Sequence, residues 1–174
     1  PCVMKGYYNN PQATAEVIEE REGKRYFHTG DFCEYKQNQI IIKGRIKNII
    51  VLDSGKNINP EEVENVLERL PIIKEALVKA EEAEGKQVEK IKADILPYFD
   101  KVRKTGAINS KKEDFSPEEL KSIKEVIWPG IKRKQKDLAP FKRVKSKEDI
   151  KIKEDEFEKT STEKIKRHKH QDET

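Results

Sequence analysis

The chain has 174 residues, of which 40% are charged and 34% belong to the hydrophobic class, so its apolar core is expected to be modest. Its 37 basic and 33 acidic residues leave a net charge of only +4, which is weak support for a polyanionic partner. No apolar run approaches the roughly 20 residues of a membrane span, and the first residues lack a signal-peptide core. We expect one domain, or a small domain with part of another, without a transmembrane segment.

The two cysteines, Cys2 and Cys33, form no CxxC motif and have no histidine partner at metal-site spacing. They are predicted to be reduced thiols of a cytoplasmic protein. His168 and His170 form an HxH pair, which is too small a ligand set for a metal ion by itself. The sequence therefore predicts no metal site.

The first 44 residues are predicted to be rich in strands, with one short helix. The helix is expected over 12–20, after an Asn-Pro start. The aromatic stretch RYFHTGDF, residues 25–32, predicts a strand that is interrupted at its Thr-Gly-Asp turn. The runs at 31–35 and 40–45 flank a polar turn, and together they predict a β-hairpin.

The next segment predicts a short strand followed by an amphipathic helix. The β-branched run at 47–52 leads into a Ser-Gly turn. Asn59 fits the N-cap of a helix, and Pro60 fits its first position. Apolar residues follow at helical spacing as far as Leu70, and Pro71 is expected to end the helix.

The rest of the chain predicts further strands and one long helix. Strands are expected at 72–80, 90–99, 142–146 and 149–157, with a polar turn at 81–87 and a loop at 103–114. The helix begins at Ser116, and Pro129 is expected to kink or split it. Because strands and helices do not strictly alternate, the predicted fold class is α+β, a small mixed sheet flanked by helices after a β-rich beginning.

Three residues could act on a nucleotide, although each has a simpler interpretation. Asp31 could accept hydrogen bonds from both ribose hydroxyls, or it could be an ordinary turn aspartate. Arg45 could present its guanidinium to a phosphate or a ribose, or it could be a surface charge. Lys164 follows a Thr-Ser-Thr run and could bring an ammonium to a phosphate, whereas composition alone favours a solvated basic tail.

Four stretches follow one another along the chain: GYYNNPQATAEVI, YFHTGDF, IIIKGRIKNIIVLDSGKNINPEEVENVL and FEKTSTEKIKR. Together they resemble the carboxyl-terminal part of the AMP-forming adenylate ligases, a superfamily that includes acyl-CoA synthetases, luciferases and the adenylation domains of peptide synthetases. The match is dense over 1–80 and 157–167 and loose over 81–156. The residues of these stretches, above all VLDSGKNINPEEVE and KTSTEKIKR, are most similar to those of the long-chain fatty acid–CoA ligases.

This resemblance implies an ATP-dependent ligase that joins a fatty acid to AMP, with release of pyrophosphate, and then transfers the acyl group to CoA. Asp31 would hold the ribose hydroxyls of ATP or AMP, and Arg45 would contact the same nucleotide. Lys164 matches the lysine that bridges the carboxylate and the α-phosphate during adenylation.

The resemblance also implies residues for the second reaction. Lys47 stands where the superfamily has its hinge. Gly55, flanked by Lys56 and Asn57, lies in the loop that forms the pantetheine tunnel for CoA. A small domain that turns about one hinge residue could exchange the face that carries the lysine for the face that carries this loop.

Residues 1–44 would be the carboxyl-terminal remnant of a large nucleotide-binding domain, and residues 45–174 a mobile carboxyl-terminal domain. The rest of the large domain would be missing, and it would hold most of the Mg²⁺. The chain by itself is therefore expected to be inactive. Its expected partners are a fatty acid, CoA or an acyl carrier protein, and the missing domain; no nucleic acid is expected. The expected location is cytoplasmic, with peripheral association to a membrane left open.

Two residues depart from the pattern of the superfamily. Glu158 and Glu163 stand where it commonly has proline and glycine, and both could compete for the Lys164 ammonium. The other basic residues of this run are expected to be solvated, namely Lys166, Arg167 and Lys169. The alternatives are an acyl–carrier-protein ligase of the same superfamily and a non-catalytic basic interaction module, including one that binds nucleic acid.

Overall fold

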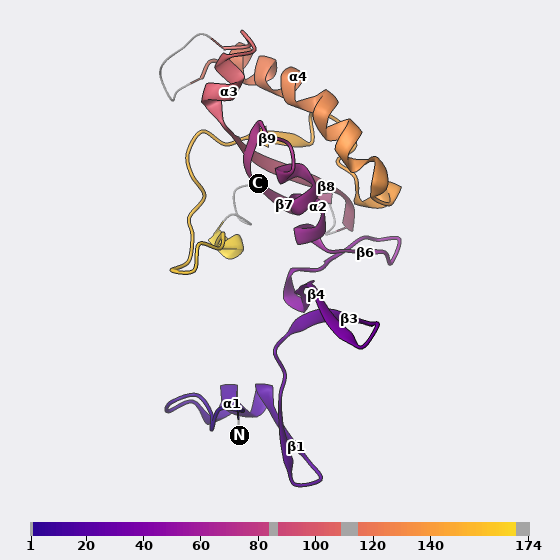
Figure 1. The fold of residues 1–174 in the computed structure, drawn as a ribbon, viewed down its shortest axis with the longest axis vertical. Helices are drawn as coiled ribbons and strands as arrows, with labels where there is room; N and C mark the ends of the chain where they lie inside the picture. The colour runs from indigo at the N-terminus through magenta and orange to yellow at the C-terminus, as the bar shows by residue number, and fades with distance from the viewer. Residues whose placement is uncertain (1, 84–86, 109–114, 170–174) are drawn as a thin grey trace. The chain divides into compact units, whose positions relative to one another are not determined.

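The computed structural model describes residues 2–83, 87–108 and 115–169. The chain divides into two compact units, Pro1–Lys47 and Asn48–Thr174, which we call the amino-terminal unit and the carboxyl-terminal unit. Figure 1 shows the ribbon of each unit.

The amino-terminal unit is built from a short helix and two β-hairpins. Its elements are α1 (Pro11–Val17), β1 (Ile18–Arg21), β2 (Lys24–Phe27), β3 (Asp31–Lys36) and β4 (Gln39–Arg45), followed by the 3₁₀ turn η1 (Ile46–Asn48). The helix predicted over 12–20 is too long, because the chain is already extended at Ile18, which pairs with Phe27 across the first hairpin. A β-branched side chain packs well in a strand, so this pairing ends the helix.

Both hairpins turn through two residues in the left-handed region. Gln37 and Asn38 have φ of 51° and 63°, and Glu22 and Gly23 have φ of 48° and 71°. Two such residues in succession match the twist of the flanking strands. The hairpin predicted around 36–39 is thus confirmed, with β3 and β4 paired antiparallel. Within residues 2–47, the part of this unit that the structure describes, no side chain is buried.

The carboxyl-terminal unit combines short strands, helices and a three-stranded sheet. Its elements are β5 (Ile50–Val51), β6 (Asn57–Ile58), α2 (Pro60–Glu68), β7 (Ile73–Ala83), β8 (Gln87–Pro97), α3 (Phe99–Arg103), α4 (Pro117–Lys134), η2 (Gln135–Asp137), η3 (Pro140–Lys142), β9 (Ile150–Ile152) and η4 (Arg167–Lys169). Figure 1 shows α4 beside the sheet formed by β7, β8 and β9.

The sheet has the order β7-β8-β9 and is mixed. β7 and β8 are antiparallel, whereas β9 runs parallel to β8, with Ala93 opposite Ile150. The predicted α+β class, with a small mixed sheet and flanking helices, is confirmed. Residues 84–86 of the predicted turn and 109–114 of the predicted loop lie outside the described residues, and so does His170.

The two main helices begin as the sequence predicts. The Asn59 side chain accepts a hydrogen bond from the Glu61 N–H at 3.2 Å, and Ser116 and Glu119 form a reciprocal capping box. The predicted split at Pro129 is wrong, because α4 continues to Lys134. Buried isoleucines lie on both sides of the proline, and their packing outweighs its cost: Ile123, Ile127 and Ile131.

The core has two parts on opposite faces of the sheet. Ala76 and Val78 point into the larger cluster, together with the apolar faces of α2 and α4. Leu77 lies between them in sequence and points to the other face, where it packs with Leu96 and Phe157. The segment around Phe157 is therefore held against the sheet.

The strand predicted at 142–146 is wrong. Val144 is buried, but its N–H donates to the Gln135 side chain at 3.1 Å, and its carbonyl accepts from the same amide at 2.9 Å. A buried glutamine thus replaces the partner strand. The strand predicted at 149–157 forms only over Ile150–Ile152.

Candidate active site

Asp31 and Arg45, the two residues predicted to bind the nucleotide, lie opposite each other across the β3–β4 hairpin. Arg45 Nε is 3.0 Å from Asp31 Oδ1, and Arg45 Nη1 donates to the Thr29 carbonyl at 2.5 Å. Gly30 lies between Thr29 and Asp31 and makes the turn there possible, since its φ is 70°. The hairpin therefore presents one carboxylate and one guanidinium together, a pair suited to ribose hydroxyls and phosphate.

Lys47, the predicted hinge residue, lies in the 3₁₀ turn η1 and is the last residue of the amino-terminal unit. The next residue, Asn48, belongs to the carboxyl-terminal unit, where its side-chain amide donates to Glu61 Oε1 at 2.6 Å. The boundary between the two units thus falls directly after the predicted hinge.

Gly55 lies in the tight turn between β5 and β6. Its φ is 73°, its N–H donates to the Leu52 carbonyl at 2.8 Å, and a Cβ added to it would meet no atom within 4 Å. Two hydrogen bonds between Asp53 and Val88, at 3.1 and 2.8 Å, fasten this turn to β8. The turn is therefore held in place while its backbone remains open to a ligand.

The neighbours of Gly55 have different surroundings. Lys56 is exposed, and its ammonium is 5.0 Å from the centre of the Phe141 ring. Asn57 begins β6 and pairs with Val51.

Lys164 lies in a tight hairpin near the end of the described chain. Lys159 and Ile165 form an antiparallel bridge, and the Thr160 N–H donates to the Lys164 carbonyl at 2.8 Å. The Glu163 N–H donates to the Thr160 carbonyl at 3.0 Å, and Glu163 itself has a φ of 60°. The turn needs a left-handed residue directly before the exposed Lys164 side chain.

Glu158 and Glu163 do not pair with Lys164. Glu158 lies 2.7 Å from the Lys169 ammonium, and Glu163 lies 3.7 Å from the Lys159 ammonium. Across the described residues, no carboxylate lies within 4.0 Å of the Lys164 ammonium. An exposed cation directly after the turn of a hairpin can approach an anionic ligand.

Comparison with known proteins identifies the group to which the chain belongs. No family model matches it. A chloroplastic long-chain-fatty-acid–[acyl-carrier-protein] ligase of Arabidopsis thaliana is 31% identical over 134 residues, which cover 71% of this chain and 16% of that enzyme. The AMP complex of the A domain of a carboxylic acid reductase from Segniliparus rugosus superposes with a TM-score of 0.72 at 20% identity, over 95% of this chain and 24% of that one. The chain belongs to the adenylate-forming ligase superfamily.

A second curated relative, a D-alanine–D-alanyl carrier protein ligase of Staphylococcus aureus, is 41% identical over 76 residues, which cover 44% of this chain and 16% of that enzyme. The chain thus spans only about a sixth of the length of these members of the superfamily. The resemblance that the four quoted stretches carry is confirmed at the level of the superfamily.

Arg167 is expected to be solvated, but in the structure its side chain is largely buried and forms ion pairs with α2. Its side chain is 19% exposed, and its guanidinium pairs with Glu64 on α2. Burial raises the pKa of the Glu64 carboxyl, and the Arg167 charge opposes part of that rise. The sequence does not predict this ion pair because Arg167 and Glu64 are 103 positions apart. The one available signal is an arginine three residues after Lys164, within the stretch FEKTSTEKIKR.

The start of the lysine hairpin is also attached to the sheet. The Lys159 ammonium is 2.5 Å from Glu75 on β7, and this hydrogen bond raises the pKa of Lys159. Phe157 is buried beside Leu77, with Ile165 packed against the same cluster. Both ends of the hairpin are therefore anchored to β7 or α2.

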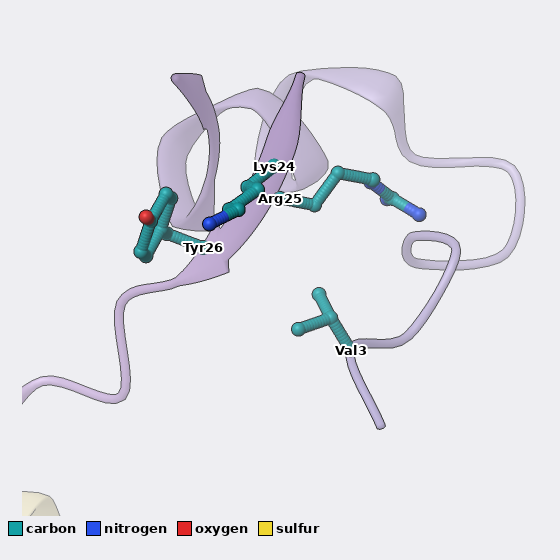
Figure 2. Close-up of a pocket in the computed structure, with 4 residues that line it drawn as sticks. All are labelled: Val3, Lys24, Arg25 and Tyr26. Carbon is teal, nitrogen blue, oxygen red and sulfur yellow. The ribbon is translucent and has the colours of Figure 1, made fainter. Parts of the chain in front are cut away.

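Other features of the described residues add no ligand site. They contain no group of three or more His, Cys, Asp or Glu side chains arranged to hold a metal ion, and none of their helices is long and apolar enough to cross a membrane. A hollow of about 500 Å³ in the amino-terminal unit is lined by Val3 and by Lys24, Arg25 and Tyr26 of β2. Figure 2 shows these four side chains. None of the predicted site residues lines it.

Proposed function

We propose that the chain is the carboxyl-terminal portion of an AMP-forming ligase that activates a fatty acid. In the first reaction the acid attacks the α-phosphate of ATP, giving acyl-AMP and pyrophosphate. In the second, a thiol attacks the acyl carbon, giving a thioester and AMP. Residues 1–44 would complete a large nucleotide-binding domain, and residues 45–174 would form a mobile domain that turns about Lys47.

The observation that carries this proposal is the exposed Lys164 ammonium on its anchored hairpin. Attack of a carboxylate on a phosphate brings two anions together. A cation between them lowers their repulsion and stabilises the charge that develops in the transition state. Asp31 and Arg45 would bind the ribose and phosphate of the same nucleotide. The described residues do not fit a magnesium site, so we assign no step of this chain to that ion.

The second reaction requires a narrow approach for a pantetheine thiol. The Gly55 turn would provide it, since it has no side chain and its Cβ position is open. Lys56 and Asn57 would flank the same passage. The thiol loses its proton as its sulfur bonds to the acyl carbon, and AMP leaves with the electrons of the broken acyl–phosphate bond.

The proposed thiol is that of CoA, with an acyl carrier protein as the second candidate. The second candidate is supported by the Arabidopsis relative, which is named for ligation to an acyl carrier protein. Both acceptors offer a pantetheine thiol, so the residues of this chain fit either one. Product analysis of the full-length protein with CoA and with carrier protein separates the two.

The role of Lys164 is tested by Lys164→Ala in the full-length protein, with the two half-reactions assayed separately. ATP–pyrophosphate exchange is expected to fall by about 10²–10³-fold, because one group that stabilises the transition state is lost. Thioester formation from preformed acyl-adenylate is expected to continue. Lys166→Ala is the matched control, since Lys166 lies in the same run and its ammonium is 3.8 Å from Glu158. Equal loss of both half-reactions in Lys164→Ala would remove the role assigned here.

A further inference from the structure

We propose that Arg167 is a positioning residue, which fixes the Lys164 hairpin through Glu64 and Glu61 of α2 so that adenylation, and not thioester formation, depends on it. This inference rests on the proposed function. Arg167 does not need to touch a substrate. It would act through the backbone of the two residues that separate it from Lys164, Ile165 and Lys166.

The first observation is the way in which Arg167 closes the free edge of the sheet. β7 is an edge strand, and both polar backbone groups of Val78 face away from β8. The Val78 N–H donates to Glu64 Oε1 at 2.6 Å, and its carbonyl accepts from Arg167 Nη1 at 3.4 Å. Arg167 Nη2 donates to the other oxygen of Glu64. The Arg167–Glu64 ion pair thus satisfies the backbone groups of Val78 that a neighbouring strand would otherwise bind.

The second observation is a link from Arg167 towards the proposed hinge. Arg167 Nε lies 3.7 Å from Glu61 Oε1, the same oxygen that accepts from the Asn48 amide at 2.6 Å. Asn48 directly follows Lys47, the proposed hinge. Glu61 therefore connects the lysine hairpin to the part of this unit that lies closest to the hinge in sequence, whereas Glu64 connects the hairpin to β7.

The third observation is the shortness of the connection from Arg167 to Lys164. Ile165 forms the bridge with Lys159, and the Lys166 N–H donates to the Glu158 carbonyl at 2.8 Å. These contacts transmit the position of Arg167 to the hairpin. The Lys159–Glu75 pair holds the other end, so loss of Arg167 removes the ion pair that ties the carboxyl-terminal side of the hairpin to α2 and leaves the packing of Ile165 on that side.

Adenylation is sensitive to such a loss because the ammonium must lie between two anions. A displacement of about 1 Å can cost about 10²-fold in rate. Thioester formation does not use Lys164 in the proposed mechanism. A positioning role therefore predicts that only one half-reaction is lost, whereas a purely structural role predicts that both decline together.

The experiment compares Arg167→Met, Arg167→Lys and the double variant Arg167→Met/Glu64→Gln in the full-length protein. Arg167→Met is expected to slow ATP–pyrophosphate exchange by about 10²-fold and to leave thioester formation from preformed acyl-adenylate unchanged. It should also lower the melting temperature, because Glu64 is left buried without its cation. Arg167→Lys keeps the charge but not the fork, so it should fold normally and still show slower exchange.

The double variant separates positioning from stability. Glutamine keeps the acceptor for the Val78 N–H and removes the buried charge, so the melting temperature should recover while exchange stays slow. Lys169→Met is the matched control, because it removes an exposed cation two residues further on, and it should change neither the melting temperature nor the rate of exchange.

Recovery of both the melting temperature and the rate of exchange in the double variant, or equal slowing of the two half-reactions in Arg167→Lys, overturns the proposal. If Lys164→Ala abolishes exchange and the Arg167 variants do not slow it, only the positioning role fails. If Lys164→Ala has no effect, the proposed function itself fails.

Discussion

The two units of the chain differ in how much their side chains bury. In the carboxyl-terminal unit, α2, α4 and the sheet share a continuous core in which residues such as Leu67, Ile95 and Ile127 are at most 1% exposed. Within residues 2–47, no side chain is buried, and large apolar side chains are exposed, including Tyr8, Tyr35, Ile40 and Ile42. One unit has a core of its own, and the other is held together by local pairing.

The site residues share this difference. Asp31 and Arg45 meet because they are partners in one hairpin, and such a hairpin is marginally stable in water without further packing. Lys164 is placed by contacts with β7 and α2 that lie far away in the sequence. Presentation of the lysine therefore depends on the tertiary fold of its unit, whereas presentation of the Asp31–Arg45 pair depends on what covers the hairpin.

The strongest test of this comparison is to separate the units. A protein of residues 48–174 is expected to unfold cooperatively on heating, because its apolar core is complete enough to offset the entropy of ordering. A peptide of residues 1–47 is expected to show no cooperative transition, since it buries no apolar side chain. Circular dichroism against temperature measures both. A cooperative transition of the 1–47 peptide at a concentration where it is monomeric would contradict the comparison.

Sequence reasoning succeeded where the decisive contacts are local. The polar turn between two β-branched runs predicted the β3–β4 hairpin, and the apolar face that follows Asn59 predicted α2. It failed where a distant residue decides. The sequence predicts a strand at Val144 because nothing in it shows that the Gln135 amide satisfies the backbone of Val144.

The placement of the candidate site residues follows the same rule, and their roles stay a prediction. Asp31, Arg45, Gly55 and Lys164 came from short motifs, and the structure places each of them in a turn or hairpin with its own local hydrogen bonds. The sequence predicts a solvated Arg167 because its partner Glu64 lies 103 residues away, and no periodicity or spacing links the two residues.

A second test compares one ion pair from each unit. Asp149 is 2% exposed and accepts hydrogen bonds from Lys90 at 2.5 Å and from Ser146 at 3.0 Å. Burial alone would raise the pKa of Asp149, but these hydrogen bonds outweigh it and hold the pKa below 3.8. The stability that the ionised carboxylate provides is therefore present above pH 3.8 and is lost as the pH falls through the lower folded value.

Asp149→Asn should accordingly lower the free energy of unfolding by about 1–3 kcal/mol at pH 7, because hydrogen bonds to a buried charge are lost. The difference from the parent chain should shrink as the pH falls from 3.8 through the lower pKa of the folded state, where the parent carboxyl becomes protonated as well. Glu34→Gln is the matched control in the amino-terminal unit, where Glu34 and Lys43 form an exposed pair at 2.9 Å. Glu34→Gln should leave the denaturation curve unchanged both at pH 7 and below pH 3.8. If the loss in free energy of unfolding caused by Asp149→Asn did not depend on pH, the amide would destabilise the chain through its shape and not through the loss of charge.

The smallest expected effect concerns the left-handed residues that both units contain. Glu163 has a φ of 60° in the carboxyl-terminal unit, and Glu22 has a φ of 48° in the amino-terminal unit. Glu163→Gly should raise the free energy of unfolding by about 0.5 kcal/mol, since glycine removes a left-handed penalty of about 1–2 kcal/mol but orders a more flexible residue. Glu163→Gln keeps the backbone penalty and removes the charge, so it should give no gain. Glu22→Gly removes the same left-handed penalty in a unit without a core. The denaturant concentration at the midpoint of the cooperative transition should therefore not change. Chemical denaturation of the three variants measures all of these, and an equal gain from Glu163→Gln would assign the effect to charge instead of backbone.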